Sequence, residues 1–172
     1  PEDVSTNLNN YSVITVNGNF TLKDSNTASR NNVLTIGEEQ ITFVGGVITG
    51  GYSFNGGGVC VNSGATFTMN GGTIAGNTAV RADDSSENNL GRGGGVYAGG
   101  TFTMNGGAIS YNTAAIGGGV SVREEAVFTM KGGEISHNSA VYAEGGSGNI
   151  DAQESSIGGG VNVGDGSFIM EG

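Results

Sequence analysis

A three-part unit that recurs along the chain is the feature that most constrains its fold. The unit reads Gly-Gly-Gly-Val-x-Val or a close variant, then Phe-Thr-Met, then x-Gly-Gly-x-Ile-x-x-Asn-x-Ala, and its clearest copies begin at Gly56, Gly93, Gly117 and Gly158. Self-similarity of this kind is typical of solenoids, in which each unit packs only against its neighbours. The sequence therefore predicts a repeat protein.

Each unit contains three short segments that alternate apolar and polar side chains. Glycine or asparagine bounds these segments and no helical period is present, so we expect short strands joined by turns. The shortest step between equivalent glycines, Gly94 to Gly118, is 24 residues. We therefore predict an all-β fold, a right-handed single-stranded parallel β-helix with coils of about 24 residues and three short strands per coil.

Aligned copies carry the same apolar residue type at equivalent positions, and these positions are the predicted core. The residues between them vary, as expected if alternate side chains point outward from the sheet, away from the core. Identical residues one coil apart would stack about 4.8 Å from each other, and Asn77, Asn112 and Asn138 would form an amide ladder that satisfies turn backbone groups. The core columns are Val59, Val96, Val120 and Val161; Phe67, Phe102, Phe128 and Phe168; Met69, Met104, Met130 and Met170; and Ile74, Ile109 and Ile135.

The whole chain, residues 1–172, is expected to form one solenoid. Residues 56–172 hold the regular coils and residues 1–55 hold degenerate ones. The last copy stops at Met170, before its third segment, which predicts a chain truncated at its C-terminus. The degenerate strands are predicted at Ile14-Thr15-Val16, Phe20-Thr21-Leu22, Val33-Leu34-Thr35-Ile36, Ile41-Thr42-Phe43 and Gly45-Gly46-Val47-Ile48.

Insertions lengthen two of the coils, whose steps are 37 and 41 residues. Both insertions, Val80 to Arg92 and Val141 to Ile157, fall between the Asn-x-Ala segment and the next triple glycine. They are rich in Asp, Glu, Ser, Asn and Gly, a composition typical of surface loops. We expect them to project from one side of the solenoid, where localised function would lie.

Composition and charge exclude several classes of protein. The 35 glycines and single proline lack the three-residue period of collagen. A net charge of −10 repels phosphate backbones and anionic lipids, so nucleic acid is not an expected partner. No apolar run approaches the roughly 20 residues that span a bilayer, so this segment is not expected to insert into a membrane.

The repeats resemble those of the chlamydial polymorphic outer membrane proteins, whose signatures are Gly-Gly-Ala-(Ile/Leu/Val) and Phe-x-x-Asn. Literal matches occur at Gly106-Gly107-Ala108-Ile109, Phe67-Thr68-Met69-Asn70 and Phe102-Thr103-Met104-Asn105. The resemblance covers the chain from about Gly45 onward. It implies a bacterial β-helical surface segment, secreted or wall-associated, that forms a stalk with an adhesive surface.

Few side chains are candidates for chemistry, and we expect no catalytic, cofactor-binding or metal-binding residue. His137 is the only histidine and aligns with Gly76 and Tyr111, so we expect a variable surface residue. Cys60 is the only cysteine, can form no intrachain disulfide, and is expected to be an unreactive outward residue.

The acidic insertions leave one chemical alternative open. Their carboxylates could in principle supply a glycosidase pair or calcium ligands, although a solvated acidic loop is the simpler interpretation. These residues are Asp83, Asp84, Glu87, Asp151 and Glu154.

Two repeated patterns have structural interpretations. The glycines of Gly91-Arg92-Gly93-Gly94-Gly95 are predicted to be turns, because no Gly-Lys-(Ser/Thr) follows them. The outward column Thr68, Thr103 and Thr129 is expected to be an ordinary solvated ladder, with an ice-binding face as the alternative.

We therefore predict a non-enzymatic extracellular or bacterial cell-surface protein, a stalk or filament subunit that displays acidic loops. The expected partners are a host or matrix glycan or protein, or further copies of the chain joined head to tail through the coil ends. The alternative is a carbohydrate-active β-helix, either a polysaccharide lyase or a glycoside hydrolase, but a fold alone does not establish an activity.

Overall fold

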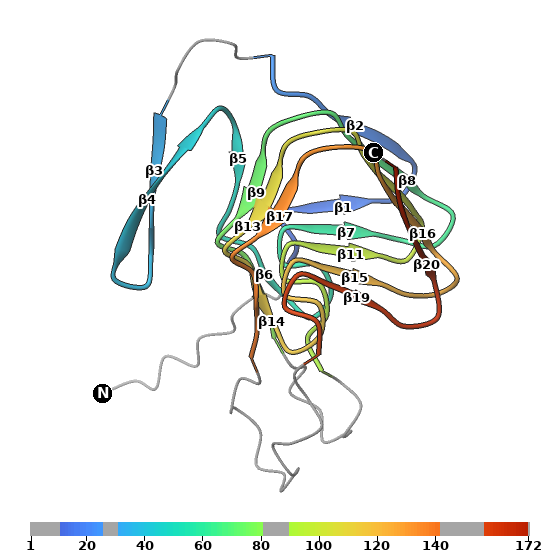
Figure 1. Cartoon of the computed structure of the whole chain (residues 1–172). Helices are drawn as coiled ribbons and strands as arrows, with labels where there is room; N and C mark the ends of the chain where they lie inside the picture. The colour runs from blue at the N-terminus through green and yellow to red at the C-terminus, as the bar shows by residue number, and fades with distance from the viewer. Residues whose placement is uncertain (1–10, 26–30, 81–89, 142–156, 172) are drawn as a thin grey trace, which may run out of the picture.

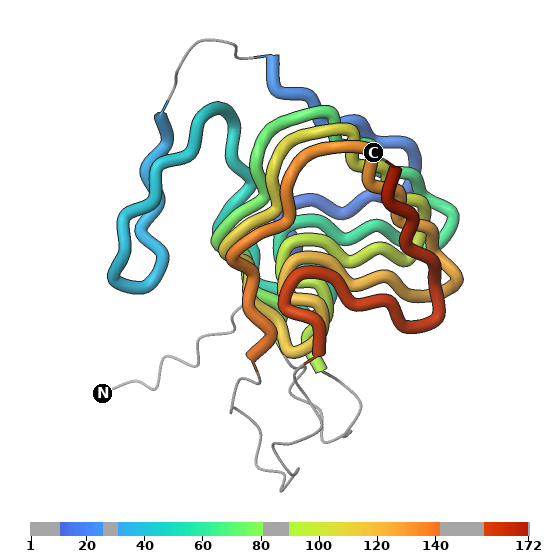
Figure 2. The backbone as a smooth tube through the Cα atoms, viewed as in Figure 1, coloured from blue at the N-terminus to red at the C-terminus, as the bar shows by residue number. Residues whose placement is uncertain are grey.

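The structure is a computed structural model that describes residues 11–25, 31–80, 90–141 and 157–171. These residues form strands and turns, and no helix occurs among them. Parallel strands of successive coils pair into four sheets that run along one axis (Figure 1). The backbone trace shows the coils stacked one behind another (Figure 2). The predicted parallel β-helix is confirmed.

Each sheet takes one strand from every coil that it crosses. The first sheet contains β1 (Ile14–Val16), β7 (Val59–Val61), β11 (Val96–Ala98), β15 (Val120–Val122) and β19 (Val161–Val163). The second contains β2 (Asn19–Leu22), β8 (Thr66–Met69), β12 (Thr101–Met104), β16 (Val127–Met130) and β20 (Ser167–Met170). The third contains β5 (Val47–Ile48), β9 (Thr73–Ala75), β13 (Ala108–Ser110) and β17 (Glu134–Ser136). The fourth contains β6 (Tyr52–Ser53), β10 (Thr78–Ala79), β14 (Thr113–Ala114) and β18 (Ser139–Ala140).

The three predicted strands of each coil are the strands of the first, second and third sheets. The fourth sheet adds a two-residue strand that directly follows the repeated asparagine. Two residues are too few to show an alternating pattern, so this strand has no separate signal in the sequence.

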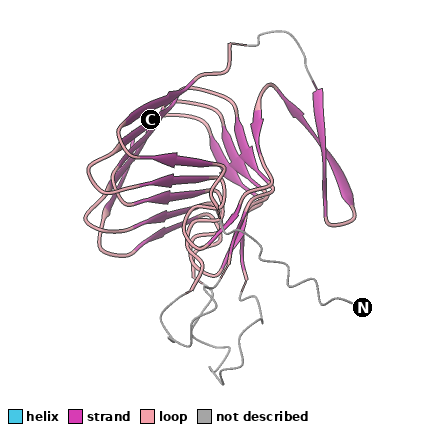
Figure 3. Cartoon of the chain, turned by 180° about the vertical axis from the view of Figure 1, so that it is seen from behind, coloured by secondary structure: helices cyan, strands magenta, loops and turns pink. Residues whose placement is uncertain are grey.

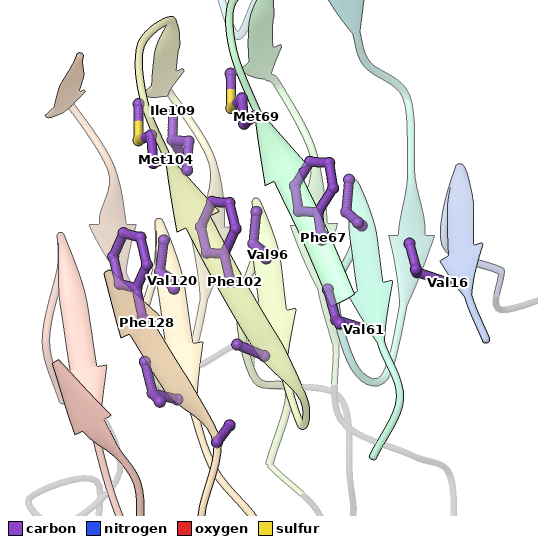
Figure 4. Close-up of a cluster of buried hydrophobic side chains, with 14 of the residues drawn as sticks. Val16, Val61, Phe67, Met69, Val96, Phe102, Met104, Ile109, Val120 and Phe128 are labelled. Atoms are coloured by element: carbon purple, nitrogen blue, oxygen red, sulfur yellow. The ribbon is translucent and has the colours of Figure 1, made fainter. Parts of the chain in front are cut away.

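The predicted columns are in register and form the core (Figure 4). Phe67, Phe102 and Phe128 are fully buried, and their rings stack with centroids 5.0 and 4.5 Å apart. Burial falls in the last coil, where Phe168 is only partly buried and Met170 is 71% exposed. A parallel stack of identical coils therefore places like residues in contact along the axis.

One prediction for the N-terminal region is wrong. Residues 33–36 and 41–43 do not form a parallel coil; they lie in β3 (Asn31–Ile36) and β4 (Glu39–Val44), which pair antiparallel. The two strands are joined by Gly37 and Glu38 alone, and Gly37 has φ 64°. A positive-φ glycine in a two-residue loop favours a tight hairpin, so local pairing wins over stacking. The hairpin lies between β2 and β5 in the sequence and projects beside the stacked coils (Figures 1 and 3).

The hairpin packs against the turn that links the third and fourth sheets. Phe43 is 9% exposed and meets the ring of Tyr111 edge to face, with centroids 6.0 Å apart. Ile36 approaches Gly76, where an added Cβ would lie 3.5 Å from its Cδ1. The hairpin is thus anchored to the coils by apolar contacts.

The predicted asparagine ladder is also present. The Nδ2 of Asn77 donates to Oδ1 of Asn112, and the Nδ2 of Asn112 donates to Oδ1 of Asn138, both at 3.0 Å. The backbone N–H groups of Asn77 and Asn112 donate to the same oxygens, at 3.1 and 3.0 Å. Each amide also donates to the carbonyl of an isoleucine in the preceding coil, namely Ile48, Ile74 or Ile109. The ladder therefore satisfies buried turn groups in every coil that it crosses.

The triple glycines have a steric role where the chain enters the first sheet. A Cβ on Gly57 would lie 2.6 Å from the carbonyl oxygens of both Gly94 and Thr78. The segment is thus held between the next coil and the fourth sheet, with no room for a side chain.

Candidate functional site

The outer face of the first sheet carries a column of mostly polar side chains. Its outward column is Thr15, Cys60, Tyr97, Ser121 and Asn162, in register across five coils. The sequence predicted variable, solvated residues at these positions, but Tyr97 is 6% exposed and Ser121 is fully buried. Other side chains therefore cover the middle of this face.

Arg92 lies in the same coil as Tyr97, just before the triple glycine that leads into β11. It belongs to a row of isolated parallel bridges, which joins Asn55, Arg92, Ile116 and Ile157 immediately before the triple glycines. Burial is the main cause that lowers the pKa of Arg92, and the charges of Arg123, Tyr97 and Asp165 have smaller effects, so the guanidinium lies within electrostatic range of these groups. The face thus combines groups from the bridge row and from the first sheet.

A turn at the end of β15 contains three charged residues, Arg123, Glu124 and Glu125. It runs from Arg123 to Ala126 and is closed by a 2.9 Å bond from the Ala126 N–H to the Arg123 carbonyl. Its central residues Glu124 and Glu125 have φ of 58° and 60°. Two positive φ values define a type I′ turn, which normally uses Asn and Gly. Left-handed backbone costs a residue with a Cβ roughly 1–2 kcal/mol, so this turn is strained.

Contacts from both neighbouring coils hold the strained turn. The hydroxyl of Tyr97 donates to Oε1 of Glu124 at 2.9 Å. From the other side, Oδ1 of Asp165 accepts the Glu124 N–H at 3.0 Å and lies 3.4 Å from Nε of Arg123. Three successive coils are therefore joined through one turn.

Glycines in the neighbouring coils make room for these side chains. A Cβ on Gly99 would lie 3.1 Å from Oε2 of Glu124. A Cβ on Gly164 would lie 2.5 Å from Nη1 of Arg123. The Glu124 carboxylate therefore rests over the preceding coil and the Arg123 guanidinium over the following one.

Three groups with clearly shifted pKa values, Cys60, Tyr97 and Arg92, lie at or near this face. Burial, with a smaller effect from the negative charge of Glu124, raises the pKa of the Cys60 thiol to about 11. Burial and the hydrogen bond to Glu124 raise the pKa of Tyr97. Burial, and then the charge of Arg123, lower the pKa of Arg92. Clustered shifts of this kind are typical of functional sites, although structural networks also produce them.

The face can both donate and accept hydrogen bonds. Arg92 and Arg123 offer guanidinium donors, and Glu124 and Asp165 offer carboxylate acceptors. The formal charges of these four groups sum to zero, and Glu125 in the same turn adds one negative charge, whereas the chain as a whole carries −10. Such a face suits a ligand with many uncharged polar groups.

The structure places the residues singled out from the sequence in different parts of the molecule. Cys60 lies at this face, half-buried. His137 is exposed and stacks on Tyr111, with ring centroids 4.9 Å apart. The threonine column lies in register on the outer face of the second sheet. The acidic residues Asp83, Asp84, Glu87, Asp151 and Glu154 lie outside the described residues.

Sequence reasoning did not assign Tyr97, Arg123, Glu124 or Asp165 to a site. They occupy positions where the repeat varies, and variable positions in a repeat predict solvent-exposed residues without a specific role. The available signal was the spacer after Val122, where Arg-Glu-Glu stands in place of the small residues found in the other copies. Arg92 and Arg123, two of the six basic residues of an acidic chain, lie within electrostatic range of each other.

Comparisons with known proteins assign no family. No family model, no curated protein and no solved structure matches the chain. Within the described ranges, no helix has the length and hydrophobicity to cross a membrane. Among the same residues, no group of three or more His, Cys, Asp and Glu side chains is placed to hold a metal ion.

Proposed function

We propose that this protein is a non-enzymatic scaffold of the bacterial cell surface or extracellular space, which displays its acidic insertions for adhesion. The observation that carries the proposal is the location of the insertions. Both leave the coil after a fourth-sheet strand, at Val80 and Val141, and both return at the bridge row, at Arg92 and Ile157. In the coil between them, Ala115 alone connects β14 to the bridge residue Ile116.

A stalk needs rigidity along its axis, and three features of the stack supply it. Ladders of backbone hydrogen bonds run through the coils, the phenylalanine column is continuous, and the buried asparagines bridge consecutive turns. Each coil contacts only its neighbours, so the length of such a stack can grow without a change of fold. The insertions then sit at a fixed corner of a stiff rod.

Binding is favoured over turnover because both carboxylates of the polar face are already engaged. Glu124 accepts the Tyr97 hydroxyl, and Asp165 accepts a backbone N–H and pairs with Arg123. A glycosidase requires one carboxyl group poised to donate a proton and a second facing the substrate. The engaged pair supports the non-enzymatic proposal.

Deletion of the insertions tests the display role. Removing residues 81–91 or residues 142–156 joins Val80 to Arg92 or Val141 to Ile157, which reproduces the direct connection through Ala115. Both variants should keep the β-sheet circular dichroism spectrum and the melting temperature of the full chain. Retention on immobilised mucin and collagen should fall at least tenfold.

Release of new reducing ends from polysaccharides, measured with the same proteins, separates adhesion from catalysis. Reducing ends produced by the full chain and lost on substitution of Asp83, Asp84 or Glu87 by Ala would overturn the proposal in favour of a carbohydrate-active enzyme. Equal retention of the full chain and of both deletion variants would show that the insertions are not the adhesive part.

A further inference from the structure

The polar face of the first sheet has a composition that the scaffold role does not require. A turn between β15 and β16 could be made from glycine and small residues, as it is at Gly99-Gly100 and around Gly64. Here it contains Arg-Glu-Glu with two strained positions, Glu124 and Glu125. Strained backbone positions cluster at functional sites, so this turn is a starting point for a hypothesis of binding.

A buried hydroxyl gives a second, independent indication. Ser121 lies at the centre of the outward column, between Tyr97 and Asn162. Its Oγ is buried and has no hydrogen-bond partner. Buried polar atoms are almost always paired in native proteins, and an orphan costs about 1–3 kcal/mol. The Ser121 hydroxyl lies beneath this face, so a ligand that displaces part of the covering side chains would supply the hydrogen bond that it lacks.

The charge pattern selects the class of ligand. An anionic chain would meet Glu124 and Asp165 as well as the arginines, and a cationic one would meet the arginines. Sugar hydroxyls both donate and accept, so one neutral saccharide can use guanidinium, carboxylate, hydroxyl and amide groups together. The site takes residues from three successive coils, which span roughly 10 Å along the axis and suit two or more linked sugars better than a single ring.

We propose that the outer face of the first sheet, around Tyr97, Ser121, Arg123, Glu124, Asn162 and Asp165, binds a neutral polysaccharide chain. The proposal rests on the adhesive function proposed above and names a class of ligand for it. It places saccharide binding on the sheet face, whereas the deletion experiment above tests adhesion by the insertions. The two can therefore fail separately.

Titration of the full-length isotope-labelled chain by NMR tests the proposal. The probes are cellohexaose, xylohexaose, mannohexaose and chitohexaose, with hexagalacturonate as an anionic comparison. At least one neutral probe should shift the amide resonances of Ser121, Asn162 and the Arg123–Ala126 turn. A shallow face predicts weak binding, with a dissociation constant on the order of 1 mM.

Isosteric variants separate recognition from folding. Glu124→Gln and Asp165→Asn keep an oxygen to accept the bonds from the Tyr97 hydroxyl and the Glu124 N–H, but remove both negative charges. Together they should weaken binding about tenfold. Ser121→Ala removes an orphan hydroxyl, so it should weaken binding without lowering the melting temperature.

The matched control is the Lys131–Glu171 pair at the edge of the second sheet. Its atoms lie 3.3 Å apart, and its side chains are about as exposed as that of Asp165. Glu171→Gln should therefore leave saccharide binding unchanged.

Three results would overturn the proposal. The first is no shift with any neutral probe, the second is shifts confined to other faces, and the third is a response to hexagalacturonate alone. Removal of residues 81–91 or residues 142–156 should leave the titration unaltered even where it abolishes retention on mucin. A titration lost on those deletions would assign saccharide binding to the insertions instead.

Discussion

Asn77 and Asn112 are 35 residues apart in sequence, yet the side-chain amide of Asn77 donates a 3.0 Å hydrogen bond to the side-chain oxygen of Asn112 in the buried turn of the next coil. The same oxygen accepts the Asn77 backbone N–H, and the amide of Asn112 donates to the Ile74 carbonyl at 2.9 Å. The Asn112 side chain therefore satisfies both a backbone N–H and a backbone carbonyl of the coil before it.

Replacing Asn112 by alanine should destabilise the protein by about 3 kcal/mol or more, because at least two buried partners lose their hydrogen bonds. Urea denaturation followed by circular dichroism measures the change. Asn105→Ala is the control, since Asn105 makes the same type of bond to Asn70 at 2.7 Å on the exposed surface. It should change stability by less than about 0.5 kcal/mol, and equal losses for both variants would refute the role of burial.

Phe102→Ala should cost about 3–5 kcal/mol, because it opens a cavity in the middle of the aromatic column. The ring of Phe102 lies between those of Phe67 and Phe128, at centroid distances of 5.0 and 4.5 Å. Phe168→Ala in the partly buried last coil should cost much less. Thermal melts of the two variants compare them directly. A larger loss at position 168 than at position 102 would contradict the packing argument.

Glu125→Gly should stabilise the protein by roughly 0.5–1 kcal/mol, since glycine adopts the positive φ of 60° without strain. Glu124→Gly should gain less, because it also removes the acceptor of the Tyr97 hydroxyl. Chemical denaturation of both variants checks the order. If Glu125→Gly proves destabilising, the turn is not held against its backbone preference.

The thiol of Cys60 should be unreactive near neutral pH. Its pKa of about 11 leaves almost no thiolate at pH 8, and the thiolate is the reactive form. Labelling with a disulfide reagent should be slow in the folded chain and fast in urea. Glu124→Gln should speed the folded reaction modestly, because the charge of Glu124 contributes to the raised pKa.

The same shift predicts a loss of stability at high pH. The folded pKa lies above the unfolded value of about 9, so the contribution of Cys60 is complete below pH 9 and falls as the pH rises towards 11. Cys60→Ser should flatten this part of the stability profile. An unchanged slope in the variant would assign the loss to other groups.

The repeated part of the fold could be predicted from the sequence because the same residue type recurs at each core position in successive copies of the repeat. One valine in a strand says little, but Val59, Val96, Val120 and Val161 at equivalent places require one stacked column. The hairpin was missed for the opposite reason. Its strands occur once, and the deciding signal was a two-residue loop at Gly37 and Glu38 that makes local pairing favourable.

The polar face was harder still, because it is made from departures from the repeat. Tyr97 and Glu124 meet only because a strand of one coil and a turn of the next lie side by side. Which variable residues meet across coils depends on side-chain direction and on room left by residues such as Gly99 and Gly164. A repeat predicts which equivalent residues stack, but it does not predict which of the residues that depart from the repeat contact one another.

The single-residue connection at Ala115 has a consequence for how such a chain can change over generations. The framework on either side of that corner resumes in the same register, whether the detour is one residue or many. A duplication or deletion confined to this corner leaves every buried contact where it was. Evolution can thus insert or delete segments at this corner, one coil at a time, while the rest of the fold is unchanged.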